Sequence, residues 1–385
     1  MLESALSDEP LQRTALHARQ VELGARMVPF AGYEMPVQFK AGIITEHTRT
    51  RTAAGLFDVS HMGQAFLSGP DHHTTALALE KLVPAEILGL ERGRVRYTQL
   101  TTPEGGIIDD LMVARSASPS DDGKLMLIVN ASRKSIDYAW LEQNMPANVT
   151  LVVSGDRSLL ALQGPKAEAV LSRYCPKAAG LLFMSAAAAQ FDGIDIHLAR
   201  TGYTGEDGYE LSLATRDVNA VYDRLLADPD VQPVGLGARD SLRLEAGLCL
   251  YGHDIDESTT PVEADLAWSI GKRRRAEGGY MGAAKITREL TQGPSRRRVG
   301  ILPEGRASAR QGTSITSDGR SIGRITSGGF GPTVGHPVSM GYVDASYAAV
   351  GTPLELIIRD KPVASIVTKL PFIPHRYKRQ PGGAV

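Results

Sequence analysis

The chain contains 385 residues, of which 42% are hydrophobic and 22% are charged, a composition typical of a globular protein with two or three domains. Its formal net charge is −1, so no bulk electrostatic signal indicates binding to nucleic acid or to a membrane surface. No apolar run reaches the roughly 18 residues that a membrane-spanning helix needs.

The hydrophobic pattern predicts a mixture of strands and helices in the first 226 residues. The expected strands cover residues 125–129, 159–162, 194–198 and 209–213, the last two as an antiparallel pair. The expected helices cover residues 11–23, 132–141, 165–174 and 218–226. The last helix has the clearest pattern, because Val218, Val221 and Leu225 recur at helical spacing.

The pattern changes near Pro294. From residue 297 to 372 short β-rich runs alternate with turns such as the glycine-rich stretch 327–331, which predicts a small, mostly β barrel or sandwich. Mixed strands and helices followed by a β unit indicate the α+β class rather than a doubly wound parallel sheet.

Cysteine usage and the first residues bear on the cellular compartment. Cys175 and Cys249 are far apart and outside any metal-ligand motif, so neither a disulfide framework nor a cysteine-bound metal is expected. Residues 1–10 are acidic and poor in apolar side chains, unlike a signal or transit peptide. Both observations favour a reducing, cytoplasmic location.

Two adjacent carboxylates lie inside an apolar, strand-like run at residues 105–113. On a strand Asp109 and Asp110 point to opposite faces, and both faces are otherwise mostly apolar, so periodicity does not choose between them. A carboxylate in such surroundings is costly unless it is paired, neutral or functional. The alternative is a charged pair that protects a sheet edge from aggregation.

A third acidic residue follows a tight turn at residues 203–208. Glu210 lies beside Leu211 and Leu213, where its carboxylate can accept two parallel hydrogen bonds from an amino-pyrimidinone edge. The alternative is an ordinary hairpin with a partly exposed acid.

Residues 237–247 combine charged side chains with a helical apolar pattern. Arg239 follows two glycines and can present its planar guanidinium to an anion at the edge of a cleft. The same spacing fits an amphipathic helix with Asp240 and Ser241 as capping residues and a surface ion pair.

The sequence does not decide the roles of several other polar groups. Asp58, Ser60 and His61 are too close in sequence to form a hydrolase triad on one strand. Asn130, which ends a predicted strand, either binds a ligand or caps the following turn. The basic run 272–275 is a solvated face or, as the second interpretation, a docking surface for an acidic partner.

Together these residues resemble one family, the aminomethyltransferases or T-proteins of the glycine cleavage system. The resemblance extends from about residue 11 to residue 377. Its most specific segments are residues 57–62, 105–110, 200–208, 237–247 and 250–257. It implies an α+β fold of three domains arranged like a cloverleaf around a central folate-binding channel. Two interleaved α+β domains would occupy residues 11–292, and a C-terminal β-barrel domain would occupy residues 295–375.

The resemblance also implies a reaction. The one-carbon unit of an aminomethyl group on the lipoyl arm of H-protein passes to the co-substrate tetrahydrofolate, which yields methylene-tetrahydrofolate and ammonia. The expected partners are therefore lipoylated H-protein and tetrahydrofolate, with no metal, nucleic acid or membrane. A single carboxylate suits this chemistry, since it can take up a proton and stabilise developing positive charge.

The site residues follow from the same resemblance. Asp110 matches the family's key carboxylate, which is thought to orient and activate the folate amine nitrogens, and Glu210 matches the acid that recognises the pterin. The other expected folate-binding residues are Arg239, Tyr97, Asn130, Tyr203, Met62 and Tyr377. Tyr377 matches a C-terminal tyrosine of some members, while others carry a basic residue near that position.

Two alternatives share the expected fold. One is a tetrahydrofolate-dependent demethylase of a small methylated substrate, against which the close match over residues 250–266 argues. The other is a non-enzymatic folate-binding protein of iron–sulfur assembly. That family carries a Lys-Gly-Cys motif, whereas this chain has four basic residues at 272–275 and no cysteine nearby.

Overall fold

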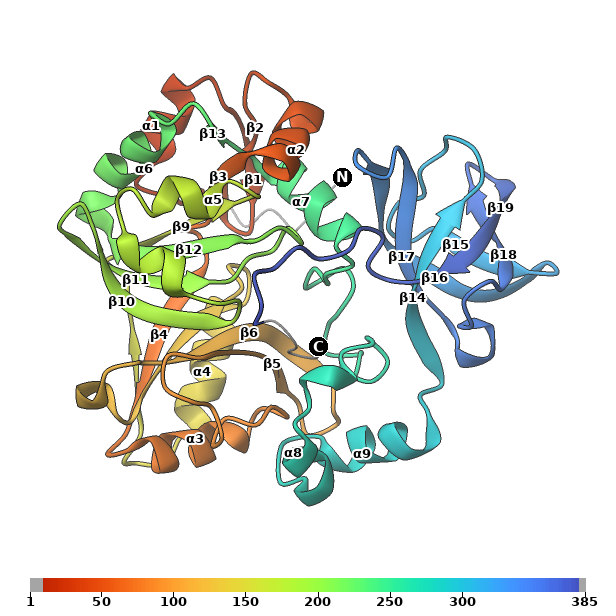
Figure 1. Ribbon diagram of the computed structural model, residues 1–385. Helices are drawn as coiled ribbons and strands as arrows, with labels where there is room; N and C mark the ends of the chain where they lie inside the picture. Colours follow the sequence, from red (N-terminus) through yellow and green to blue (C-terminus); the bar gives the residue numbers. More distant parts are fainter. Residues whose placement is uncertain (1–9, 381–385) are drawn as a thin grey trace.

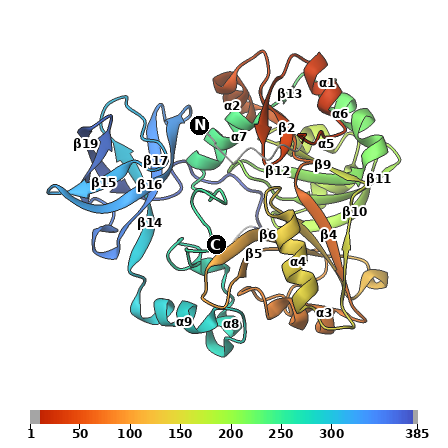
Figure 2. The ribbon, with the colours of Figure 1, turned by 180° about the vertical axis from the view of Figure 1, so that it is seen from behind.

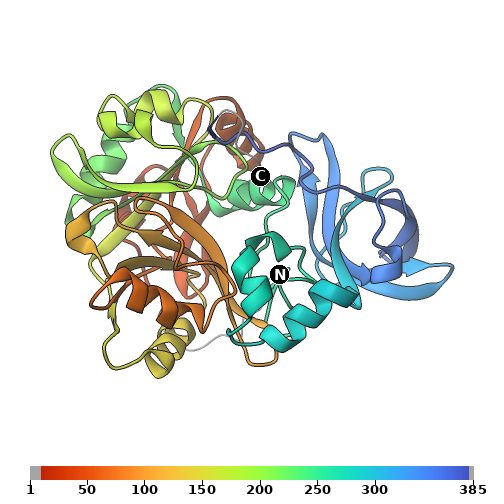
Figure 3. The same cartoon turned by 60° about the horizontal axis from the view of Figure 1, so that its bottom comes forward.

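The computed structural model describes residues 10–380, and the acidic segment 1–9 discussed above lies outside the described residues. Three lobes surround a common centre: a six-stranded sheet with its helices, a five-stranded sheet with its helices, and a β-barrel (Figure 1). The views from behind (Figure 2) and from below (Figure 3) show the same arrangement. The α+β class with a C-terminal barrel is confirmed.

The first lobe is a sheet with the strand order β10-β11-β12-β9-β3-β13, antiparallel except for the β13–β3 pair. Its strands are β3 (Ala54–Asp58), β9 (Arg157–Gln163), β10 (Ser185–Phe191), β11 (Ile194–Arg200), β12 (Gly208–Ala214) and β13 (Val231–Pro233). The helices α1 (His17–Glu22), α5 (Ala167–Leu171) and α6 (Val218–Leu226) lie in this lobe. On α6 the buried side chains are Val218, Val221, Tyr222 and Leu225, which confirms the predicted apolar face.

The second lobe is an antiparallel sheet with the order β5-β6-β7-β4-β8. Its strands are β4 (Gly63–Ser68), β5 (Val95–Thr101), β6 (Ile107–Arg115), β7 (Lys124–Val129) and β8 (Thr150–Val153). Apolar side chains of α3 (His72–Glu80) and α4 (Lys134–Asn144) share one buried core with this sheet. Because β3 precedes β4 and β9 follows β8 in the chain, the first two lobes are interleaved in sequence.

The other faces of the two sheets pack against each other. Val95, Ala114 and Met126 from the five-stranded sheet form one apolar cluster with Ala186 and Ala199 from the six-stranded sheet. Side chains on these facing surfaces therefore come from both lobes and meet in the interior of the protein.

The third lobe is a closed barrel with the order β14-β17-β16-β15-β18-β19. Its strands are β14 (Arg296–Pro303), β15 (Ser314–Ser317), β16 (Arg320–Gly331), β17 (His336–Asp344), β18 (Pro353–Ile358) and β19 (Lys361–Thr368). Helix α7 (Leu236–Glu245) joins this lobe to the first, since Leu244 packs against Val338 and Met340 of the barrel.

The remaining elements are short. They are β1 (Arg26–Phe30), β2 (Tyr33–Gln38), α2 (Ile43–Thr52), α8 (Lys272–Glu277), α9 (Ala283–Gln292) and the 3₁₀ turns η1 (Pro119–Asp121), η2 (Pro176–Gly180), η3 (Thr215–Asp217), η4 (Ala267–Ser269) and η5 (Ala345–Tyr347). None of the helices within residues 10–380 has the length and apolar character needed to cross a membrane.

Three helix boundaries differ from those expected. The helix predicted over 11–23 is limited to α1, and the one predicted over 165–174 is limited to α5. Helix α7 begins after Gly235, whose N–H donates to Glu46 Oε2 at 2.8 Å, so a distant carboxylate satisfies the helix start. Asp240 and Ser241 consequently lie in the middle of α7, and the expectation that they cap it is wrong.

Candidate active site

The two carboxylates of β6 have different surroundings. Asp109 is fully buried, whereas Asp110 is partly exposed on the opposite face of the strand. Asp110 is paired in register with Gln99 of β5, and the Tyr97 hydroxyl on the same strand donates to Asp110 Oδ2 at 2.9 Å. Tertiary packing thus distinguishes two neighbours that periodicity leaves equivalent.

Asn130 connects the two acids. Its backbone N–H donates to Asp109 Oδ2 at 2.9 Å, and its side-chain Nδ2 lies 2.9 Å from Asp109 Oδ1 and 2.8 Å from Asp110 Oδ1. Asn130 follows β7, the strand that pairs with β6, which places it beside both carboxylates. The amide therefore fixes the orientation of Asp110 relative to Asp109.

The electrostatic environment of Asp110 favours its protonated form. Burial and the charge of Asp109 raise the pKa of Asp110 to about 7. Burial and the Asp110 carboxylate raise the pKa of Tyr97 well above its ordinary value, so the tyrosine remains a hydrogen-bond donor. A carboxyl group with a pKa near neutrality can both accept and return a proton at physiological pH.

Glu210 projects from the opposite sheet. It lies on β12 between Ala199 of β11 and Ala161 of β9, and Thr201 Oγ1 donates to Glu210 Oε2. Glu210 lines a cavity of about 30 Å³ between the sheets, whose other wall includes Met112 of β6. Met112 lies two residues after Asp110, so Glu210 and Asp110 belong to facing surfaces of the two sheets. A cavity of this size can hold water.

Arg239 and Tyr203 lie together close to these acids. The Arg239 guanidinium lies over the Tyr203 ring, 4.7 Å from its centroid, and the Tyr203 hydroxyl donates to the Cys249 carbonyl oxygen. Burial lowers the pKa of Arg239, which the charge of Glu210 partly opposes. Burial raises the pKa of Tyr203, and the Asp110 charge adds to this effect.

Met62 and Tyr377 occupy different surroundings. Met62 packs on the apolar cluster of Phe57 and Val59 at the connection between β3 and β4. Tyr377 stacks on Phe183 with ring centroids 3.8 Å apart, and the Arg379 guanidinium lies 5.8 Å from the Tyr377 centroid. The structure thus gathers Tyr97, Asn130, Tyr203, Glu210 and Arg239 near Asp110, whereas Tyr377 stacks on Phe183 instead.

Two residues near Asp110, Trp268 and Gln99, were not identified from the sequence. Trp268 stacks on Tyr97 with centroids 5.5 Å apart although it is 65% exposed, and Ser269 Oγ donates to Gln99 Oε1 at 3.1 Å. Both Trp268 and Gln99 therefore contact or neighbour the Tyr97–Asp110 pair. Neither belongs to a periodic pattern, and only the number of tryptophans, two in the chain, could have drawn attention to Trp268.

Gly106 allows another chain segment to cross the start of β6. A Cβ atom at this position would lie 1.7 Å from the carbonyl oxygen of Glu257. The Ile107 N–H is directed at the carbonyl oxygens of Asp256 and Thr259, both at 3.1 Å. The crossing segment 256–259 thereby holds the end of β6 that leads to Asp110.

Arg243 of helix α7 forms a buried ion pair with Asp254 and a hydrogen bond with the barrel. Arg243 Nη1 lies 2.7 Å from Asp254 Oδ2, and Arg243 Nη2 donates to Ser327 Oγ of β16 at 2.9 Å. Both members of the pair are almost fully buried. The charge-rich segment 237–247 therefore serves two purposes, since Arg239 faces the acids and Arg243 anchors the third lobe.

The candidates near the β3–β4 connection have structural partners. Asp58 Oδ2 accepts hydrogen bonds from Thr14 Oγ1 at 2.7 Å and from Gln20 Nε2 at 2.8 Å. His61 is buried beside Phe30, and burial lowers its pKa to about 3, so the imidazole is neutral.

The basic run 272–275 is divided: Lys272 and Arg275 are exposed, whereas Arg273 and Arg274 are bound to acids of the same protein. Arg273 forms ion pairs with Glu80, Glu86 and Glu277, at 2.6, 2.8 and 2.6 Å. Arg274 is buried and also pairs with Glu80. The solvated-face interpretation is wrong for Arg273 and Arg274, because these side chains hold α8 against the second lobe; docking of an acidic partner on this run stays a prediction.

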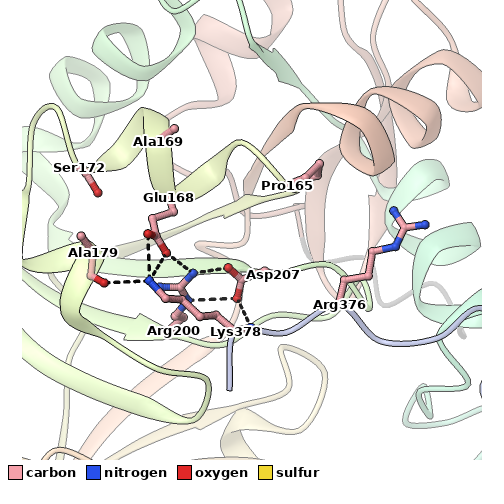
Figure 4. A pocket seen from close by; sticks show the side chains of 9 residues that line it. All are labelled: Pro165, Glu168, Ala169, Ser172, Ala179, Arg200, Asp207, Arg376 and Lys378. Atoms are coloured by element: carbon pink, nitrogen blue, oxygen red, sulfur yellow. Dashed lines mark hydrogen bonds and ion pairs between the residues drawn. The ribbon is translucent and has the colours of Figure 1, made fainter. Parts of the chain in front are cut away.

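Another cavity, of about 620 Å³, is lined by residues of the first lobe and of the C-terminal segment, and Asp110 is not among them (Figure 4). Its polar wall is an internal ion-pair network in which Arg200 contacts Asp207 and Glu168, and Lys378 Nζ lies 2.8 Å from Glu168 Oε2. These charges already neutralise one another and hold the C-terminal segment on the lobe.

Comparison with known proteins places these features in context. Residues 16–274 match the family model "GCVT N-terminal domain", and residues 296–373 match "Glycine cleavage T-protein C-terminal barrel domain". The chain is 39% identical to the mitochondrial aminomethyltransferase of Dictyostelium discoideum, over 97% of this chain and 95% of that protein. It is 42% identical to that of Solanum tuberosum, over 96% and 92%. The crystal structure of glycine cleavage system aminomethyltransferase T from Bartonella henselae superposes with a TM-score of 0.89 and 40% identity, covering 96% of this chain and all of that one.

Proposed function

The chain belongs to the glycine cleavage T-protein family, and we propose that Asp110 is the carboxylate that assists one-carbon transfer in it. The activity is that of an aminomethyltransferase with tetrahydrofolate as co-substrate: the aminomethyl group loses ammonia and its one-carbon unit becomes methylene-tetrahydrofolate. The relatives' names favour this activity over the demethylase and the iron–sulfur assembly alternatives.

The residues around Asp110 suit a folate. Both oxygens of the Glu210 carboxylate are acceptors, whereas a side-chain amide has only one accepting end. Glu210 can therefore accept two parallel hydrogen bonds from the amino edge of a pterin. Arg239, held over the Tyr203 ring, offers a planar cation, and Tyr203 and Met62 offer apolar surface. We assign Tyr377 to the outer part of this site on family resemblance alone.

Asp110 supplies the proton chemistry. The folate contributes the nitrogen that accepts the one-carbon unit. With a pKa near 7, Asp110 can take the proton that this nitrogen must lose. Tyr97 and Asn130 each hold one carboxylate oxygen, so the group is oriented before the carriers meet. The single observation that carries the proposal is this carboxyl group with two fixed donors and a raised pKa.

The test is tetrahydrofolate-dependent ammonia release from aminomethylated H-protein. Asp110→Asn should keep the fold and lower turnover by about two to four decades, the range for a lost acid–base group. Asp109→Asn is the matched neighbour and should be much milder. If Asp109→Asn were the more damaging change, the assignment to Asp110 would be wrong.

The partner, the compartment and the domain limits belong to the same proposal. We propose that lipoylated H-protein docks through complementary charge, so turnover should fall as ionic strength rises, while free aminomethyl-dihydrolipoamide reacts slowly and without salt dependence. Because Arg273 is internally paired, Lys272→Glu is a cleaner charge reversal than Arg273→Glu.

The named relatives are mitochondrial. The proposal of a cytoplasmic location for this chain therefore rests on its composition, and cell fractionation tests it. We place the domain limits at residues 11–292 and 295–375, to be tested by limited proteolysis.

A further inference from the structure

Asp137 is a buried acid for which the proposed reaction has no direct use. It lies in the first turn of α4, under β6, and is 0% exposed. Neither of its oxygens accepts a hydrogen bond from an N–H or O–H donor of the residues that the structure describes. An ionised carboxylate in this position would be strongly disfavoured, because burial without donors removes its solvation.

The neighbour of Asp137 is Asp109, whose side chain acts on the pKa of Asp137 both as a charge and as a hydrogen-bonding group. Two carboxyl groups can share a hydrogen bond only when one of them carries the proton. Asp109 already accepts from the backbone N–H and the Nδ2 of Asn130, which stabilises its charge. Burial and the charge of Asp109 raise the pKa of Asp137 to about 10. The proton of the pair therefore resides on Asp137.

This arrangement extends to Asp110, because Asn130 Nδ2 is hydrogen-bonded to Asp109 and Asp110 together. We propose that Asp137 is a positioning residue, whose carboxylic acid donates to Asp109, keeps Asp109 ionised, and so maintains the charge that sets the protonation of Asp110. The proposal rests on the role of Asp110 given above. It adds that helix α4, which carries Asp137, helps to set the protonation of Asp110.

Other titratable groups face these acids, among them Tyr138, which neighbours Asp137 on α4. Arg133, at the start of α4, lowers the pKa of Asp137, and Asp110 raises it. Tyr251 faces Asp109, while Tyr97 and Tyr203 face Asp110. Asp137 combines complete burial, an electrostatic effect from the neighbouring Asp109, and two oxygens that accept no hydrogen bond within residues 10–380.

The first test is the pH dependence of kcat/KM with tetrahydrofolate. Asp137→Asn keeps an N–H donor for Asp109, so the acid limb should stay where it is in the wild type. Asp137→Leu removes the donor; Asp109 then takes up a proton, and the acid limb of Asp110 should move to lower pH by about one unit or more. Glu142→Gln changes an exposed acid of the same helix and should have no effect.

An infrared titration tests the location of the proton without any assay of turnover. The wild type should show the carbonyl stretch of a buried carboxylic acid at pH 8, and Asp137→Asn should lack it. Asp110→Asn should retain this band. The two proposals can therefore fail separately: a fully active Asp110→Asn enzyme would refute the proposed role of Asp110 and would not affect the band. A band that persists in Asp137→Asn would overturn the inference. An Asp137→Leu enzyme with an unshifted acid limb would do the same.

Discussion

Compared with the wild type, Asp110→Asn should stabilise the folded protein by an amount that grows as the pH rises, although the substitution lowers activity. The pKa of Asp110 is about 7 in the folded chain, against about 4 for an aspartate in an unfolded chain. Its folded-state pKa is therefore raised, so its contribution to stability is fully present below about pH 4 and is lost as the pH rises through about 7. The substituted side chain does not titrate and avoids this loss.

The size of the effect follows from the same values. A difference of about 3 pKa units corresponds to about 4 kcal/mol of free energy of unfolding. Because Asp109, Asp110 and Asp137 titrate as a coupled group, we expect about half of this, ~2 kcal/mol. The amide of the variant can still pair with Asn130 through its oxygen and with the Tyr97 oxygen through its nitrogen. Local hydrogen bonding should therefore be preserved.

The measurement is urea unfolding of the wild type and the variant at several pH values from 5 to 8. The difference in free energy of unfolding should rise across this range in favour of Asp110→Asn, and Glu142→Gln should show no such trend. A difference that is independent of pH would mean that Asp110 has an ordinary pKa, and the argument for its proton chemistry would fail.

Three further outcomes are expected. Tetrahydrofolate at a hundredfold excess over its Kd should stabilise the wild type by about 2.7 kcal/mol, and Glu210→Gln should reduce this gain in a thermal melt; an unchanged gain would remove Glu210 from the site. Arg243→Ala leaves a buried carboxylate unpaired and should cost about 3–5 kcal/mol in urea unfolding; a loss near zero would contradict the buried ion pair. Gly106→Ala would place Cβ 1.7 Å from the Glu257 oxygen and should lower the melting temperature and activity together, whereas Gly155→Ala, with no atom within 4 Å, should change neither.

Local pattern alone determined much of the secondary structure. Helix α6 matches the predicted helix over 218–226, since its buried residues are those that recur at helical spacing. The strands predicted over 125–129 and 159–162 lie within β7 and β9. The turn-rich run after Pro294 also forms the expected β unit. These segments were predictable because a strand or helix with one buried face repeats its apolar residues at a fixed period.

Helix ends were less predictable, because partners distant in sequence determine them. The capping role expected of Asp240 and Ser241 is instead filled at Gly235 by Glu46, which precedes it by 189 residues. The run 272–275 shows the same limit: its charges indicate a solvated or docking surface, yet Arg273 and Arg274 are neutralised by acids from α3 and its surroundings.

The sequence by itself determined the α+β class and, through family motifs, the residues proposed for the site. Only the tertiary structure decided that Asp109 is buried and Asp110 faces the other sheet, that Asn130 bridges them, and that Asp137 lies beneath. The physical reason is that periodicity reports whether a position is buried but not which group it meets. The pKa of a carboxyl group depends on that second property, since burial, charge and hydrogen bonds from distant segments act on it together.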